Sequence, residues 1–191
     1  MGAWSPEQWM HYFGRGLTYE HFLEEYGTDA DRRAWQAVYE RVLLTDGQRQ
    51  VLHSFQRDVY ALCLASAWCG DCAAQCPIFA RFAEETERIR LAFIERDAEP
   101  ELRDYLKVNG GHRIPVVVFL SEDGYEAGRY GDRSLSRYRY LVERQLGLAV
   151  SQPLVDEDTL LRLVTQEWLN EFERIHWMLR LSPRLRKLHC D

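Results

Sequence analysis

The chain has 191 residues, enough for one domain with a sizeable core and some additional elements. Its composition, 46% hydrophobic and 13% aromatic, is that of a globular protein. A formal net charge of −6 argues against a general nucleic-acid binder and against a protein that binds anionic membranes, so neither partner is expected.

A helical N-terminal extension is expected over residues 1–57. Its first helix starts at Ser5 by three signs: Ser5 can act as the N-cap, Pro6 fits the first turn and Gln8 completes a capping box. Apolar residues at helical spacing, interrupted by glycines, predict the later helices. The expected helices cover residues 5–14, 19–26, 30–44 and 48–57.

Three tryptophans of this extension, Trp4, Trp9 and Trp35, have two interpretations. They could form a surface on which a ligand stacks. Aromatic residues at helical spacing are far more often buried, however, so we expect all three to lie in a core.

Residues 58–148 are predicted to form an α/β domain. The run over 59–65 is continuously apolar, which is typical of a central strand covered on both faces. Residues 123–124 are an Asp-Gly turn signal between two later strands. The remaining predicted elements are a helix over 70–88 kinked at Pro77, a strand over 89–94, a helix over 100–108, strands over 115–120 and 126–130, and a helix over 134–146.

Residues 149–191 are predicted to form a long helix and a basic tail. A loop through Pro153 reaches Asp156, a suitable N-cap. The helix then carries one apolar stripe, which needs a partner; we expect the N-terminal extension, with dimerisation as the alternative. The tail is interpreted as a solvated helix end. The stripe consists of Leu160, Val164, Trp168, Phe172, Ile175 and Leu179.

The motif Trp68-Cys69-Gly70-Asp71-Cys72 lies at the junction between the predicted central strand and the next predicted helix. Two cysteines at this spacing can form a disulfide when the second lies in the first helical turn. At the helix N-terminus Cys69 would face unpaired backbone N–H groups, which favour its thiolate, so Cys69 is the expected nucleophile. Cys72, one turn inside the helix, is the expected resolving thiol.

Three further landmarks accompany this motif: Pro77 within the helix, Ile114-Pro115 before an apolar strand, and Gly131 after the last strand. Together they make residues 59–147 resemble the thioredoxins, which carry a helix-kinking proline, a cis-proline loop and a glycine at the matching places. The resemblance implies an α/β fold with a thioredoxin-like mixed sheet and helices on both faces. It also implies a cis peptide bond before Pro115.

The resemblance further implies a thiol-disulfide oxidoreductase that reduces disulfides through the Cys69/Cys72 dithiol. The expected partners are a disulfide-containing protein or low-molecular-weight thiol substrate, and an unidentified reductase as electron donor; no bound cofactor is needed. By the same resemblance, Trp68 forms a hydrophobic lip beside the nucleophile, and Ile114 and Pro115 bind an extended substrate segment. A reduction potential near that of thioredoxin, about −270 mV, is expected.

Four residues are expected to tune the site. Gly70 and Asp71 replace the Gly-Pro pair of ordinary thioredoxins. The Asp71 carboxylate opposes a thiolate, whereas Arg113 could approach and favour it, and the sequence does not rank the two effects. Cys63 falls where thioredoxins keep a buried acidic residue; we interpret it as a small buried hydrophobe, which leaves the role of that acid unfilled.

Two alternatives accompany this interpretation. Cys76 shares a helix face with Cys72, so a metal site completed by His53, His112 or Cys190 is conceivable. A proline beside a thioredoxin-type dithiol disfavours metal, and zinc sites usually offer two clear ligand pairs, so no metal is expected. The alternative function is a binding or redox-sensing module on the same fold with little turnover.

The cysteines also bear on the compartment. They form an odd set without the even spacing of a secreted disulfide framework, which favours a reducing environment. The N-terminus lacks a basic region followed by an apolar run, and no uncharged apolar run is long enough to span a bilayer. A cytoplasmic protein is therefore expected. The five cysteines are Cys63, Cys69, Cys72, Cys76 and Cys190.

Overall fold

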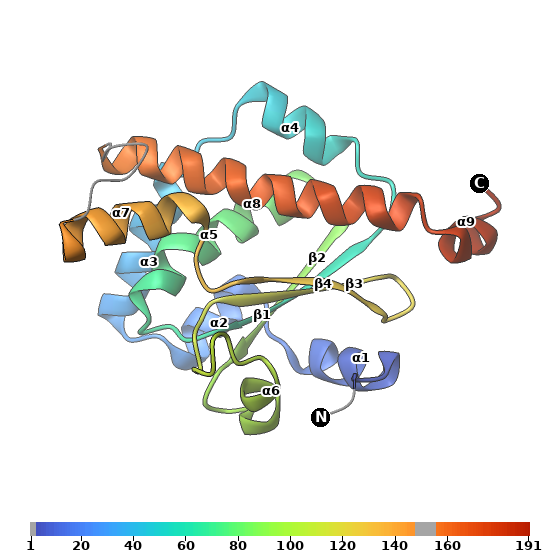
Figure 1. Cartoon of the computed structure of the whole chain (residues 1–191), viewed down its shortest axis with the longest axis horizontal. Coiled ribbons are helices and arrows are strands. Elements are labelled where there is room, and N and C mark those ends of the chain that lie inside the picture. Colours follow the sequence, from blue (N-terminus) through green and yellow to red (C-terminus); the bar gives the residue numbers. More distant parts are fainter. Residues whose placement is uncertain (1–2, 148–155) are drawn as a thin grey trace.

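The computed structural model describes residues 3–147 and 156–191 (Figure 1). The helices there are α1 (Pro6–Arg15), α2 (Tyr19–Tyr26), α3 (Asp29–Arg41), α4 (Asp46–His53), α5 (Gly70–Glu85), α6 (Pro100–Tyr105), α7 (Leu135–Leu146), α8 (Glu157–Arg180) and α9 (Pro183–His189). The strands are β1 (Val59–Ala65), β2 (Ile89–Glu95), β3 (Val116–Leu120) and β4 (Glu126–Gly131). The expected boundary at residues 148–149 and the loop through Pro153 lie outside the described residues.

The four strands form one mixed sheet in the order β2-β1-β3-β4. β1 pairs in parallel with β2 and antiparallel with β3, and β3 pairs antiparallel with β4. Every residue of β1 except Tyr60 is buried, as the continuous apolar run predicts for a central strand. The predicted mixed sheet is therefore confirmed.

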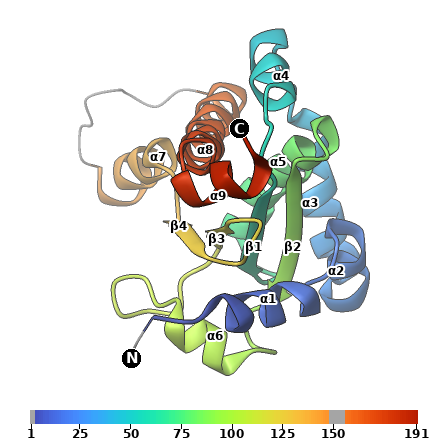
Figure 2. The same cartoon turned by 90° about the vertical axis from the view of Figure 1, so that its right-hand side faces the viewer.

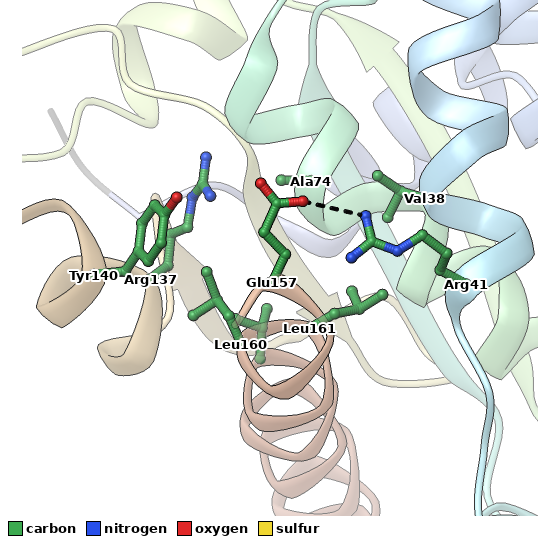
Figure 3. Close-up of a pocket in the computed structure, with 9 residues that line it drawn as sticks. Val38, Arg41, Ala74, Arg137, Tyr140, Glu157, Leu160 and Leu161 are labelled. Carbon is green, nitrogen blue, oxygen red and sulfur yellow. Dashed lines mark ion pairs between the residues drawn. The ribbon is translucent and has the colours of Figure 1, made fainter. Parts of the chain in front are cut away.

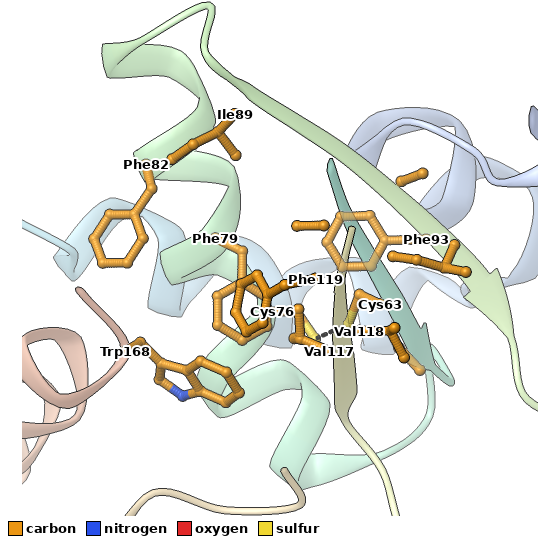
Figure 4. Packing of buried hydrophobic residues seen from close by; sticks show 14 of the residues in the cluster. Cys63, Cys76, Phe79, Phe82, Ile89, Phe93, Val117, Val118, Phe119 and Trp168 are labelled. Carbon is orange, nitrogen blue, oxygen red and sulfur yellow. Dashed lines mark hydrogen bonds between the residues drawn. The ribbon is translucent and has the colours of Figure 1, made fainter. Parts of the chain in front are cut away.

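Helices cover both faces of this sheet (Figures 1 and 2). α5, α7 and α8 lie on one face, while α1 and α6 lie on the other. The first face encloses an aromatic core, in which Phe79, Phe82, Phe119 and Trp168 are fully buried (Figure 4). Helices on both faces are thus also confirmed.

The N-terminal extension packs around this unit rather than beside it. α2 contacts β2, α3 contacts α5, and the backbone of Leu17 pairs with Phe93 of β2. Trp9 and Trp35 are fully buried, as expected, whereas Trp4 is partly buried and stacks on Tyr105 with 4.2 Å between ring centroids. The extension therefore contributes to the same core as the sheet.

Several predicted helices extend too far toward the C-terminus. α3, α4, α5 and α6 end three or four residues earlier than expected. Leu44 and Phe55, assigned to helices from their apolar character, are buried in loops instead. Thr45, assigned to a break, is the N-cap of α4 with a complete capping box. Apolar residues can thus reach the core without continuing a helix.

The apolar stripe of α8 does not pack mainly on the N-terminal extension, which was the expected partner. Trp168 and Phe172 pack edge-on against Phe79 and Phe119, respectively, so most of the stripe lies on α5 and the sheet. The N-terminal extension supplies a smaller contact through α4 and through Phe55, which stacks on a histidine of α8. The rings against which Trp168 and Phe172 pack belong to α5, β3 and β4.

The basic tail is a docked helix, α9, rather than a solvated end. Leu185 is fully buried. Arg184 Nε lies 2.6 Å from Asp123 Oδ2, which joins α9 to the turn between β3 and β4. Asp191 pairs with the buried Arg57 from the end of the extension. Cys190 is exposed.

We predict that Trp168→Ala lowers the free energy of unfolding by about 3–5 kcal/mol, because it empties a fully buried site between α8, α5 and β4. Trp177→Ala, on the same helix but 45% exposed, is the matched control and should change it by less than about 0.5 kcal/mol. Urea denaturation measures both. Equal losses in the two variants would contradict the packing described for α8.

Candidate functional site

The cysteines of the motif lie at the start of α5, directly after β1. Cys69 is the N-cap of this helix, with φ −79° and ψ 120°, and Cys72 lies in its first turn. Cys69 is half-buried, whereas Cys72 is fully buried. Trp35 of α3 donates a 2.8 Å hydrogen bond from Nε1 to the carbonyl of Ala67, which fixes the loop just before the motif.

The loop before β3 faces the first cysteine. The Ile114–Pro115 peptide bond is cis, which confirms that prediction. Cys69 Sγ lies 4.0 Å from the carbonyl oxygen of Ile114. Trp68, adjacent to Cys69, is 60% exposed and has the guanidinium of Arg96 5.0 Å from its ring centroid. The structure therefore brings the cysteines, the cis-proline loop and an exposed indole to one place.

The charges around the motif are paired. Arg133 Nε lies 2.8 Å from Asp71 Oδ2, and Arg137 Nε lies 3.2 Å from Asp71 Oδ1. Arg113 pairs with the buried Asp132 at 3.3 Å. The sequence could not rank the opposing effects of Asp71 and Arg113 on the thiolate. Both effects are reduced, because two arginines offset the Asp71 carboxylate and Asp132 pairs with Arg113.

Gln75, one turn after the second cysteine, was missed by the sequence analysis. It is fully buried, and its amide oxygen accepts hydrogen bonds from Trp168 Nε1 at 3.0 Å and from the backbone N–H of Ser134 at 3.3 Å. Its amide nitrogen donates to the carbonyls of Asp132 at 3.1 Å and Asp71 at 3.2 Å. A polar residue inside an otherwise apolar helix face was the available signal.

Glu95, at the end of β2, was also missed. Ser66 donates a 2.5 Å hydrogen bond from its hydroxyl to the Glu95 carboxylate. Burial raises the pKa of Glu95, although the Ser66 hydroxyl and nearby backbone amides oppose that shift. Parallel pairing of β2 with β1 places Glu95 beside Ala65, at the start of the loop that leads to the motif. A carboxyl group thus lies near the dithiol although Cys63 occupies the family's acidic position.

Cys69 and Cys72 lie within one turn of each other at the start of α5, so their thiols influence each other and titrate as a pair. Burial opposes a charge on Cys72, but hydrogen bonds from Cys69, Cys76 and the backbone of Ser66 outweigh it and lower the pKa of Cys72 to about 5. The hydrogen bond to Cys72, together with burial, raises the pKa of Cys69. The pair thus loses its first proton readily and holds its second tightly. This differs from the expected lowering at Cys69 alone, because the two sulfurs share one proton.

No ligand set for a metal surrounds these thiols: across residues 3–147 and 156–191, no group of three or more His, Cys, Asp or Glu side chains is arranged to hold a metal ion. Among the same residues, no helix is both long and apolar enough to cross a membrane. Cys63 is fully buried, as interpreted from the sequence.

A separate pocket of about 170 Å³ opens between α3, α5, α7 and α8 (Figure 3). Glu157 pairs with Arg41 across it at 3.7 Å. Arg137 lines this pocket and also pairs with Asp71, so its side chain connects the pocket to the motif. The pocket is lined by no cysteine, and we place the chemistry at Cys69 instead.

The comparison with known families agrees with this geometry. A family model described as Thioredoxin matches residues 16–142, which is more than half of the chain. The chain belongs to the thioredoxin family. The match begins within the N-terminal extension and ends in α7, so this thioredoxin-family chain adds α1 before the matched region and α8 and α9 after it.

Two solved structures resemble this family member over nearly its whole length. The protein of unknown function PA1234 from Pseudomonas aeruginosa is 20% identical, with 92% of this chain and 97% of that chain covered and a TM-score of 0.68. An HIV epitope scaffold is 19% identical, with 90% and 94% covered and a TM-score of 0.61. No match was found among curated proteins. These identities show a shared fold, and the coverage shows that it includes the helical additions.

We predict that Asp71→Asn lowers the pKa at which the dithiol loses its first proton, by about one unit. The Asp71 charge acts against the thiolate, and its removal also frees Arg133 and Arg137 to favour that thiolate. The rate of alkylation of the reduced protein, followed against pH, measures the shift.

Glu84→Gln is the control for this experiment, because Glu84 lies near the far end of the same helix and pairs with Arg81 at 2.7 Å. It should leave the alkylation profile unchanged. A profile that does not move in Asp71→Asn, or moves toward higher pH, would show that the Asp71 charge does not oppose the thiolate.

Proposed function

We propose that this protein is a thiol-disulfide oxidoreductase that reduces disulfides through Cys69 and Cys72. The observation that carries the proposal is the placement of this pair: Cys69, half-buried, is the N-cap of α5 beside the carbonyl of Ile114, and the fully buried Cys72 lies in the first turn of the same helix. Such a pair provides a thiolate at neutral pH and a second thiol within reach of it.

The exposure of the two sulfurs decides which one is the nucleophile and which one is the resolving thiol. A disulfide outside the protein can reach Cys69, which is half-buried, but not Cys72, which is fully buried. The backbone N–H groups of Asp71 and Cys72 favour the thiolate on Cys69. Moving the shared proton to Cys72 therefore creates the nucleophile on the accessible sulfur.

The reaction proceeds in two exchanges. The Cys69 thiolate attacks one sulfur of the substrate disulfide, forms a mixed disulfide and releases the other sulfur as a thiolate. Cys72 then loses its proton and attacks Cys69, which releases the second substrate sulfur and leaves the Cys69–Cys72 disulfide. The substrate gains two electrons and two protons, and an unidentified reductase restores the dithiol.

The surroundings of Cys69 suit an extended substrate segment. The carbonyl of Ile114 lies 4.0 Å from the sulfur and precedes the cis-proline, where it can accept a hydrogen bond from a substrate backbone. The exposed ring of Trp68 provides an apolar surface beside it. A disulfide-containing protein is therefore the preferred substrate. A low-molecular-weight disulfide is the alternative substrate.

A cytoplasmic setting forms part of the proposal. The odd number of cysteines fits a reducing compartment, and such a compartment supplies electrons to the pair.

We predict that Cys69→Ser loses disulfide reductase activity, whereas Cys72→Ser accumulates mixed disulfides at Cys69. Reduction of an aromatic disulfide with dithiothreitol as regenerator measures turnover, and mass spectrometry of trapped adducts identifies the mixed disulfides. Cys190→Ser removes an exposed thiol and should keep full activity.

The rival function, a binding or sensing module, predicts little turnover of the unaltered protein even with the regenerator present. That result would refute the proposed activity. Full activity in Cys69→Ser, or a Cys72–Cys76 disulfide as the first and only product of oxidation in place of Cys69–Cys72, would refute the assignment of the residues.

A further inference from the structure

Four cysteines form a continuous row beneath the surface at the start of α5. Cys69 is the N-cap of α5, Cys72 lies in its first turn, Cys76 follows one turn later on the same face, and Cys63 of β1 lies beside Cys76. Cys63 Sγ and Cys76 Sγ are 3.8 Å apart, and Figure 4 shows this contact at the centre of the aromatic core. The row passes from a half-buried sulfur to three fully buried ones.

The inner sulfurs, Cys63 and Cys76, come from two different elements. A disulfide between a strand and a helix does not have to distort either element along its own axis, and the sulfurs need to approach by about 1.8 Å to reach bonding distance. A disulfide between Cys72 and Cys76 would instead join residues four apart on one helix, where the Cβ atoms are too distant for relaxed geometry. Of these two inner disulfides, Cys63–Cys76 is the better stable product.

Burial limits how the inner pair can be oxidised. Cys63, Cys72 and Cys76 have no exposed surface, so a protein disulfide cannot contact them. Cys76 lies one turn from Cys72 on the same face of α5, and this neighbourhood joins the inner pair to the outer one. Oxidation by an outside disulfide therefore has to pass through the outer pair.

We propose that Cys63 and Cys76 are a second, internal dithiol that takes over the disulfide formed between Cys69 and Cys72. This inference rests on the proposed function of the outer pair. It would allow one chain to reduce two disulfides before it needs its electron donor, because each of the two pairs supplies two electrons.

The transfer is balanced without any further reagent. Cys76, as its thiolate, attacks Cys72 Sγ of the outer disulfide, so a Cys72–Cys76 bond forms and Cys69 leaves as a thiolate. Cys63 then attacks Cys76 Sγ, so the Cys63–Cys76 bond forms and Cys72 leaves. The inner pair is oxidised, the outer pair is reduced, and two protons pass from the inner thiols to the outer ones.

The transfer should be slow compared with turnover at the outer pair. Burial raises the pKa of Cys63 and of Cys76, so few thiolates form there, and the intermediate bond between Cys72 and Cys76 is strained. The thiol that leaves in the last step, Cys72, is a good leaving group because the neighbouring thiols stabilise its charge. The internal pair is therefore a reserve that is used under sustained oxidation.

The test is a time course of the reduced full chain in excess oxidised glutathione. Samples are quenched in acid, denatured and alkylated, and their disulfides are mapped by mass spectrometry. We expect the Cys69–Cys72 disulfide first and the Cys63–Cys76 disulfide later, with Cys190 as the one thiol of the five that remains to be alkylated or bound to glutathione. Four molecules of reduced glutathione are then released per chain by the two pairs, instead of two.

Three variants test the route of the transfer. Cys63→Ala should form the outer disulfide normally and lose the inner one, and Cys76→Ala should do the same. Cys72→Ser should lose the inner disulfide although both of its cysteines are present, because the connection to the surface is removed. If Cys63→Ala does not fold, Cys76→Ala and the time course of the unaltered chain still show whether the inner disulfide forms after the outer one.

Inner thiols that stay fully alkylated after the outer disulfide is complete would overturn this inference and leave the proposed function intact. Formation of the inner disulfide at an unchanged rate in Cys72→Ser would overturn the route. Failure of the outer disulfide itself would instead refute the proposed function, so the two failures are distinguishable.

Discussion

The amide of Gln75 connects the helix that carries the two cysteines to two other parts of the molecule. It is fully buried, and its four hydrogen bonds reach Trp168 on α8, the residues that precede α7, and the carbonyl of Asp71 in its own helix. Each of these buried groups would cost about 1–3 kcal/mol if left without a partner. The first turn of α5, and with it the pair Cys69/Cys72, is therefore fixed in one position relative to the cis-proline loop.

The helical additions at the two ends of the chain both pack against α5. From the N-terminal side, α3 packs along α5 and Trp35 binds the carbonyl of Ala67, just before the motif. From the C-terminal side, α8 covers α5 and supplies Trp168 to Gln75. The additions therefore do more than enlarge the core, because each contributes a hydrogen bond that positions the loop or the helix of the dithiol.

The sequence predicted those features that depend on neighbours along the chain. The order of strands and helices, the N-cap at Ser5 and the cis bond at Pro115 each follow from local residue types or from the family resemblance, and all were confirmed. Features that depend on distant partners could not be predicted. The arginines that pair with Asp71 are more than 60 residues away in the sequence, and Trp168, which donates a hydrogen bond to Gln75, is 93 residues away. Amphipathic periodicity likewise shows that a helix such as α8 has an apolar face without naming the surface that it covers.

The central claim is that Cys69 and Cys72 form a reducing dithiol, and its reduction potential tests that claim most directly. The arginines beside Asp71 and the lowered first pKa move the expected potential upward from the thioredoxin value. Equilibration with glutathione redox buffers, with the Cys69–Cys72 disulfide quantified by mass spectrometry, should therefore give about −270 to −200 mV, the range between thioredoxin and the glutaredoxins. A pair that stays reduced until about −120 mV, as in DsbA, or that never forms the disulfide, would contradict the account.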